Sequence, residues 1–119
     1  MTLTHITIST AKLEESIHFY QNAVGLTIAQ DLRTKSPLNI VFLTDANRTV
    51  NIELIENKEH PYKGSGLSIG FATADLDKEA ERLKQAGMTP GPVISPNPHT
   101  RFFFISDPNG VQIQFIEDK

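Results

Sequence analysis

The residues of this chain that could do chemistry are few, because its 119 residues include four histidines and no cysteine. Without thiols, any bound metal must be held by nitrogen and oxygen ligands, and any nucleophile must be something other than sulfur. Two similar stretches, NIELIEN and QIQFIED, differ at one chemically decisive position, since the first has Glu53 where the second has Gln114. A carboxylate accepts a proton at neutral pH and an amide does not. The two stretches are therefore chemically unequal.

The two stretches belong to a longer internal repeat. HITISTAKLEESIHFY aligns without a gap on SIGFATADLDKEAERL, VGLT aligns on AGMT, and TDANRTVNIELIENK aligns on SDPNGVQIQFIEDK with one residue removed at the turn. Three matches in the same order, at a nearly constant offset, indicate a duplication. We therefore predict one domain, 1–119, built of module 1 at 1–58 and module 2 at 66–119, with a connector at 59–65.

Each module shows the same succession of hydrophobic patterns. An alternating stretch predicts a strand, helical spacing follows, and three further extended stretches complete the module. The expected fold is therefore α+β, with a β-α-β-β-β module used twice. Thr10 is the expected N-cap of the first helix, and Thr73 or Asp75 of the second. The later strands are expected at about 26–32, 39–44 and 49–56, and at about 88–94, 101–106 and 110–117.

Alternation along the strands separates an apolar face from a polar face. One amphipathic helix per module is expected to cover the apolar face. The other face gathers His5, Thr7, Asn51, Glu53, Ser68, Gly70, Gln112 and Gln114. If two such sheets curve toward each other, these residues line a shared cleft that could bind a ligand. The alternative is that this face meets water on an open sheet.

Composition and charge restrict the class of protein. The chain is 39% apolar and 21% charged, which is ordinary for a soluble globular domain. A net charge of −3 and the lack of a Lys/Arg cluster argue against a nucleic-acid surface. No apolar run is long enough to span a bilayer, and MTLTHITIS does not have the pattern of a secretion signal. We expect a cytoplasmic protein that binds neither nucleic acid nor membrane.

The duplicated module, with HITISTAKLEESIHFYQNAVGL near the start and FFFISDPNGVQIQFIED at the end, resembles the vicinal oxygen chelate superfamily. Within it, the short chain is most similar to the glyoxalase/bleomycin-resistance type; extradiol dioxygenases and fosfomycin-resistance enzymes are other members. The resemblance covers essentially the whole chain and implies a curved, cleft-bearing mixed sheet and a homodimer. It does not select a reaction, because the fold carries many.

The resemblance also implies where a metal would be bound, because metal-using members take ligands from the first and last strands of each module. The corresponding residues are His5, Glu53, Ser68 and Gln114, where members usually have histidine at the third place and glutamate at the fourth. A hydroxyl is a poor ligand, so the implied set is His5, Glu53 and Gln114 around one divalent ion (zinc, nickel, manganese or iron). Because Gln114 cannot accept the proton that the glyoxalase I reaction moves, Glu53 is the expected catalytic residue.

Two classes of function stay open. The first is a bleomycin-resistance-type protein that binds a small organic ligand in the cleft without a metal. The second is a divalent-metal-dependent lyase or isomerase, such as a lactoylglutathione lyase-like enzyme. A third, with an inert cleft and protein partners, has no support in the sequence.

The residues expected to contact a ligand are Ser68, Phe42, Arg101, Phe102 and His99. Each has an ordinary alternative, since a phenylalanine in a strand is usually core and Arg101 also suits the edge of a strand. His99 lies in a Pro-rich loop, from which it could replace the missing histidine ligand or act as a base.

Overall fold

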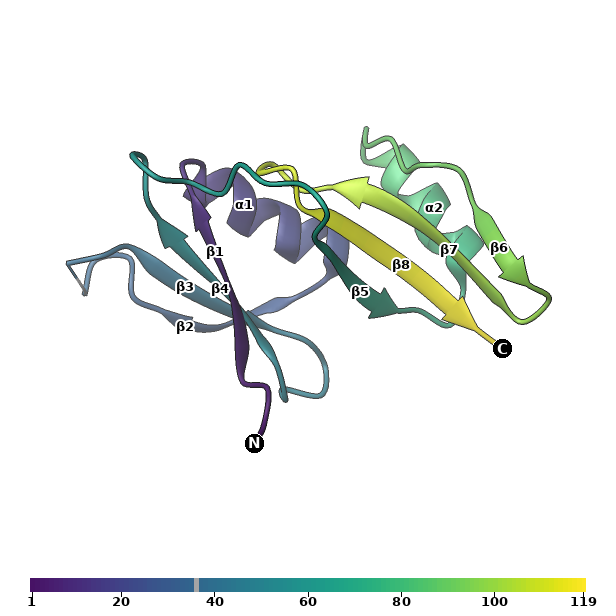
Figure 1. Ribbon diagram of the computed structural model, residues 1–119, viewed down its shortest axis with the longest axis horizontal. Helices are drawn as coiled ribbons and strands as arrows, with labels where there is room; N and C mark the ends of the chain where they lie inside the picture. Colours follow the sequence, from purple (N-terminus) through teal and green to yellow (C-terminus); the bar gives the residue numbers. More distant parts are fainter. Residues whose placement is uncertain (36) are drawn as a thin grey trace. The chain divides into compact units, whose positions relative to one another are not determined.

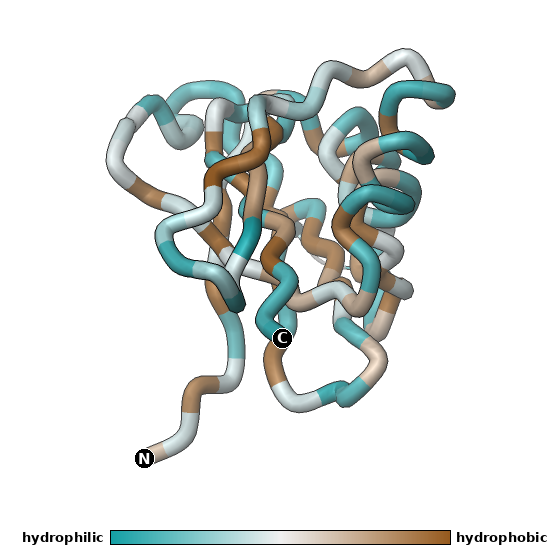
Figure 2. The backbone as a smooth tube through the Cα atoms, turned by 90° about the vertical axis from the view of Figure 1, so that its right-hand side faces the viewer, coloured by the Kyte–Doolittle hydropathy of each residue, from teal (hydrophilic) through white to brown (hydrophobic). Residues whose placement is uncertain are grey.

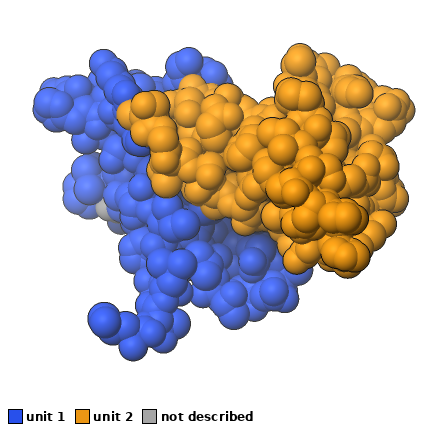
Figure 3. Space-filling model, turned by 45° about the vertical axis from the view of Figure 1, so that its right-hand side comes forward, with its two compact units in different colours: residues 1–63 blue, residues 64–119 orange. Residues whose placement is uncertain are grey.

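A computed structural model describes every residue except 36 and divides into two compact units, Met1–Lys63 and Gly64–Lys119 (Figure 3). Each unit contains one four-stranded mixed sheet and one main helix (Figure 1). The predicted α+β fold of two β-α-β-β-β modules is confirmed. The expected connector at 59–65 is divided between the two units.

Unit 1 has strand order β1-β4-β3-β2, in which β1 runs parallel to β4 and the other neighbours are antiparallel. Its helix α1 continues directly into a π-helical turn, η1. In chain order the elements are β1 (His5–Thr10), α1 (Leu13–Phe19), η1 (Tyr20–Val24), β2 (Thr27–Asp31), β3 (Ile40–Thr44) and β4 (Asn51–Glu56).

Unit 2 repeats this topology with strand order β5-β8-β7-β6 and a parallel pair β5–β8. Figure 1 shows α2 lying against its sheet. The elements are β5 (Ser68–Ala72), α2 (Leu76–Gln85), β6 (Ile94–Asn97), β7 (Thr100–Ser106) and β8 (Gln112–Asp118). Among the described residues, no helix is long and apolar enough to cross a membrane.

The core of each unit lies between its helix and one face of its sheet. Figure 2 shows hydrophobic and hydrophilic residues alternating along the chain, as expected when each element has one buried side. In unit 1 the buried side chains come from α1, η1 and alternate strand positions: Ile8, Leu13, Ile17, Tyr20, Val41, Leu43, Ile52 and Leu54. In unit 2 they include Ile69, Leu76, Leu83, Phe103, Ile105, Ile113 and Phe115.

The helix starts differ between the units. Asp75 is the N-cap of α2, and its side chain accepts a hydrogen bond from the Lys78 N–H at 3.1 Å, as one of the two predicted alternatives required. The prediction that Thr10 is the N-cap of α1 is wrong, because that position falls to Lys12. Thr10 instead accepts a hydrogen bond from the Lys12 N–H through its hydroxyl, and the Ser16 hydroxyl donates to the Lys12 carbonyl.

The strand expected at about 88–94 is the least accurate element of the prediction. Residues 88–93 have no regular structure, and β6 begins at Ile94. Pro90 and Pro92 explain the difference, since proline has no N–H to donate to a ladder. Between them, the Gly91 N–H still donates to the Phe104 carbonyl at 2.8 Å, which is the one backbone hydrogen bond from this segment to β7 among the described residues.

An aspartate organises the turn before the last strand of each unit. In unit 2, buried Asp107 accepts hydrogen bonds from the N–H groups of Asn109 and Val111 at 2.8 and 2.9 Å. In unit 1, Asp45 accepts from the N–H groups of Asn47 and Arg48, but this turn is exposed. The repeated aspartate is therefore a turn residue in both copies.

Replacing Asp107 with alanine leaves the buried Val111 N–H without its acceptor. We expect Asp107→Ala to lower the free energy of unfolding by about 1–3 kcal/mol, the usual penalty for an unsatisfied buried donor. Asp45→Ala is the matched control in the exposed turn and should cost less than about 1 kcal/mol. Urea unfolding of both variants measures the difference, and equal losses would contradict the burial argument.

Candidate functional site

The sheet face opposite the helix carries the candidate site of unit 1. The parallel register places Thr7 beside Glu53, and the antiparallel register places Phe42 on the other side of Glu53. His5 lies two residues before Thr7 and therefore on the same face. The structure thus brings three predicted site residues, His5, Glu53 and Phe42, together on adjacent strands.

Glu53 is the polar centre of this group. Its Oε1 accepts a hydrogen bond from the Thr7 hydroxyl at 2.5 Å, which is at the short end for a charge-assisted bond. His5 Nε2 lies 3.6 Å from the same oxygen. The Glu53 side chain is 12% exposed and that of His5 is 45% exposed. Within the described part of the chain, Oε2 takes part in no hydrogen bond or ion pair.

The His5 ring is held at two further points. Its Nδ1 lies 3.0 Å from the Thr4 hydroxyl, and its ring packs edge-on to Phe42 with centroids 6.1 Å apart. In the tautomer that donates from Nδ1 to Thr4, Nε2 has a lone pair that could bind a cation. One imidazole nitrogen and one carboxylate oxygen are suitable donors for a divalent cation, but they are only two.

The same face of unit 2 is chemically different. Gly70 occupies the position of Thr7, and Gln114 the position of Glu53. A Cβ at Gly70 would lie 3.0 Å from Gln114 Oε1, so the amide lies over the glycine. Ser68, the predicted counterpart of His5, is exposed and pairs with Gln112 in the ladder. This face therefore lacks both the acid and the hydroxyl that supports it.

Two aromatic rings give the unit 2 face an apolar surface. Phe102 and Phe104 are half-buried and pack edge-on with ring centroids 5.6 Å apart. Phe104 is beside Gln114 in the ladder, and Phe102 is beside Ile116 and exposed Ile94. These phenylalanines differ from Phe103, which is fully buried beneath the helix.

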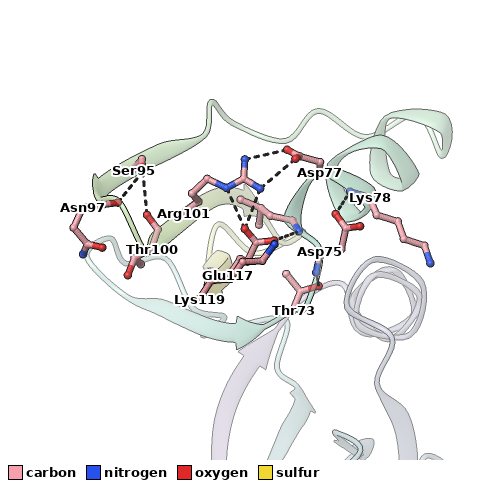
Figure 4. Close-up of polar contacts among 11 residues, drawn as sticks. Thr73, Asp75, Asp77, Lys78, Ser95, Asn97, Thr100, Arg101, Glu117 and Lys119 are labelled. Atoms are coloured by element: carbon pink, nitrogen blue, oxygen red, sulfur yellow. Dashed lines mark hydrogen bonds and ion pairs between the residues drawn. The ribbon is translucent and has the colours of Figure 1, made fainter.

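The structure does not bring Arg101 to this surface. Arg101 precedes Phe102 in β7, so its side chain lies on the helix side of the sheet. Figure 4 shows its guanidinium between Glu117 and Asp77, with hydrogen bonds of 3.0–3.3 Å. Contact with Asp77, and then with Glu117, raises the pKa of Arg101. This arginine ties the first turn of α2 to β7 and β8, and we leave it out of the proposed site.

Arg33 is likewise paired with acidic side chains. It donates hydrogen bonds to both oxygens of Asp31 and to both oxygens of Glu14 on α1, the shorter Glu14 bond being 2.7 Å. The hydrogen bonds from Arg33 lower the pKa of Asp31 to about 2. Arg33 and Arg101 thus both have acidic partners within their own units.

His99 lies in the turn between β6 and β7. Its N–H donates to Asn97 Oδ1 at 2.9 Å, and its side chain is exposed. The adjacent Thr100 is four residues from Phe104 along β7, a strand length of about 13 Å. Within unit 2, the structure does not bring His99 close to Gln114.

The set predicted from the sequence is thus only partly assembled within single units. No three His, Asp or Glu side chains of the described residues converge in a way that could hold a metal ion. The predicted addition of Gln114 to His5 and Glu53 concerns the placement of the two units and stays a prediction. The sequence places Thr7 on the polar face but gives it no metal, catalytic or ligand-contact role, whereas in the structure it is bonded to Glu53.

Comparison with known proteins identifies the family. The Glyoxalase/Bleomycin resistance protein/Dioxygenase superfamily matches the chain over residues 2–115. The chain belongs to this superfamily. Lactoylglutathione lyases from Neisseria meningitidis and Haemophilus influenzae are 29% and 28% identical to it, over 100% of the chain and 92% and 94% of the relatives.

Solved structures share the fold. An antibiotic-binding protein from a Streptomyces species superposes with a TM-score of 0.81 at 18% identity, covering 100% of this chain and 97% of that protein. A lactoylglutathione lyase from Agrobacterium tumefaciens gives 0.74 at 19% identity, covering 98% and 92%. The fold is therefore common to a protein named for binding and one named for catalysis.

The contacts of the Glu117 carboxylate predict a pH dependence of stability. The pKa of Glu117 is lowered mainly because the Leu76 N–H donates to it, and further by Arg101, while burial acts in the opposite direction. A lowered folded-state pKa stabilises the protein above the ordinary glutamate pKa, and this stabilisation is lost as the pH falls through the folded value. We expect Glu117→Gln to unfold at a lower temperature at about pH 7 and to lose less further stability than wild type toward about pH 3.

Asp118→Asn is the control, since Asp118 is the exposed carboxylate next in the chain. In Asp118→Asn the melting temperature should fall with decreasing pH as steeply as it does in wild type. If the melting temperature of Glu117→Gln fell with decreasing pH as steeply as that of wild type, the role given to Glu117 would be contradicted.

Proposed function

We propose that this chain binds a small organic molecule on the open faces of its sheets. The observation that carries the proposal is the pairing of aromatic rings with one polar side chain on each face. Unit 1 offers Phe42 beside Glu53, and unit 2 offers Phe104 beside Gln114. Apolar walls with a few polar groups that fix orientation are the usual composition of ligand sites.

The charges of these faces favour a neutral or cationic ligand. On the sheet faces that carry Glu53 and Gln114, the acidic residues of the strands are Glu53 and, at the end of β8, Asp118. Arg33 forms ion pairs with Asp31 and Glu14. Arg101 forms ion pairs with Asp77 and Glu117. An anionic ligand would meet a like charge at Glu53, and no lysine or arginine of the described strands lies on these two faces.

We expect neutral and cationic aromatic compounds to raise the melting temperature of the protein, and their carboxylate analogues not to. For a cationic compound that binds, Glu53→Gln should weaken binding about tenfold, because an ion pair becomes a neutral contact. Phe104→Ala should weaken the binding of neutral and of cationic compounds by a similar factor. Thermal shift screening followed by calorimetry measures both effects.

Two variants serve as matched controls for this screen. Glu14→Gln removes an exposed carboxylate from α1, and Leu38→Ala removes an exposed apolar side chain outside both faces. Both should bind as wild type does. A preference for the carboxylate analogues would overturn the proposal.

A second candidate function is a divalent-metal-dependent lyase with Glu53 as the catalytic residue. Two observations favour it: His5 and Glu53 lie together, and the lactoylglutathione lyase relatives match along the whole chain. His5 and Glu53 would hold the ion, with Gln114 as the third ligand, and a bound ion would polarise a carbonyl of the substrate. The neutral amide at Gln114 and the hydroxyl at Ser68 make this donor set weaker than one with two histidines and two acids.

A metal titration separates the two candidates. If the lyase proposal is right, purified protein takes up one equivalent of Ni²⁺, Zn²⁺, Mn²⁺ or Fe²⁺, and both His5→Ala and Glu53→Ala lose it. His18→Ala, which alters an exposed histidine paired with Asn22, should keep the metal. Turnover of the methylglyoxal–glutathione adduct should follow metal content. Lack of uptake at about millimolar ion, far above the concentrations at which catalytic sites retain their metal, would refute the lyase proposal.

The homodimer and the cytoplasmic location expected from the sequence remain predictions. The superfamily resemblance supports the homodimer.

A further inference from the structure

The short hydrogen bond between Thr7 and Glu53 joins two strands that are far apart in sequence. Thr7 is on β1 and Glu53 on β4, and the parallel register places them side by side. The Thr7 hydroxyl donates to Oε1 at 2.5 Å, while the His5 Nε2 faces the same oxygen at 3.6 Å. Both contacts are thus made to one carboxylate oxygen, and no described residue makes a hydrogen bond or ion pair to Oε2.

The second unit shows what the same fold does without this bond. Its counterpart of Thr7 is Gly70, which has no donor, and its counterpart of Glu53 is Gln114. No described residue donates to or accepts from the Gln114 amide. The hydroxyl and the carboxylate are therefore both present in unit 1 and both absent in unit 2. The sheet ladder forms in each unit, so the fold itself does not require the pair.

We infer that Thr7 is a positioning residue, which fixes Oε1 of Glu53 so that Oε2 is the oxygen presented to a ligand or metal ion. This inference rests on the proposed role of Glu53 as the polar group of the site. A glutamate has three rotatable side-chain bonds, and a free carboxylate must be ordered when it binds. The Thr7 bond makes that ordering part of the folded protein, in the way that outer hydrogen bonds orient metal ligands.

The alternative is that Thr7 contributes only to strand pairing. A structural role of that kind would change stability and leave the Glu53 side chain in place. The distinguishing quantity is therefore the rotamer of Glu53 in the ligand-free protein. Nuclear magnetic resonance measures it through the three-bond couplings of the Glu53 side chain.

The test compares Thr7→Val, which keeps the shape and removes the donor, with Thr7→Ser, which keeps the donor. We expect one Glu53 rotamer in wild type and Thr7→Ser, and averaged couplings in Thr7→Val. Thr27→Val is the control, since Thr27 is an exposed strand threonine whose hydroxyl bonds to none of the described residues. It should leave the Glu53 couplings unchanged. If Thr7→Val does not fold, Thr7→Ala provides the same comparison.

Mn²⁺ affinity, measured by electron paramagnetic resonance, is the second readout. We expect Thr7→Val to weaken Mn²⁺ binding about 10- to 100-fold, as loss of an outer hydrogen bond does at metal sites, and Thr7→Ser to stay near wild type. A single wild-type Glu53 rotamer in Thr7→Val would overturn the inference, whatever the Mn²⁺ result. If wild type binds none of Ni²⁺, Zn²⁺, Mn²⁺ and Fe²⁺ but the couplings change as expected, the role of Thr7 stands and the lyase proposal fails.

Discussion

The parallel pairing of the first and last strands of each unit is the constraint on which the candidate site depends. Residues 5 and 53 are far apart in sequence, and only the β1–β4 ladder brings their side chains onto one face. Because side chains alternate along a strand, a shift of one residue in this register would turn His5, Thr7 and Glu53 into the core. The buried Ile8, Ile52 and Leu54, which occupy the other face, make such a shift costly. The core thus fixes the site by filling the opposite side of the same sheet.

Alternation and repetition were enough to predict most of this arrangement from the sequence. The repeat predicted the β-α-β-β-β topology, and the two-residue period placed His5, Thr7 and Glu53 on the polar face. The pairing of Thr7 with Glu53 could not be predicted in the same way, since it depends on the exact offset between β1 and β4. Hydrophobic pattern selects the face of a strand, but hydrogen bonds across the ladder select its neighbour.

Where the predictions were less accurate, local composition hid the pattern. RFFFIS contains three consecutive phenylalanines, so hydropathy does not show which of them face the helix. Alternation along the strand determines the faces: Arg101 lies on the same side as buried Phe103, whereas Phe102 and Phe104 lie on the opposite side. Arg101 found acidic partners on α2 and β8 that no local pattern indicates. The strand expected at 88–94 was interrupted by prolines that remove ladder donors, a local signal that outweighed the symmetry of the repeat.

The close approach of the Gln114 amide to Gly70 has a historical consequence. Any side chain introduced at position 70 would press on that amide, whose flexible end would have to give way. The effect of a substitution at either position thus depends on which residue occupies the other. After the duplication, a mutation at either of these two positions therefore met a different neighbour, depending on whether the other position had already changed.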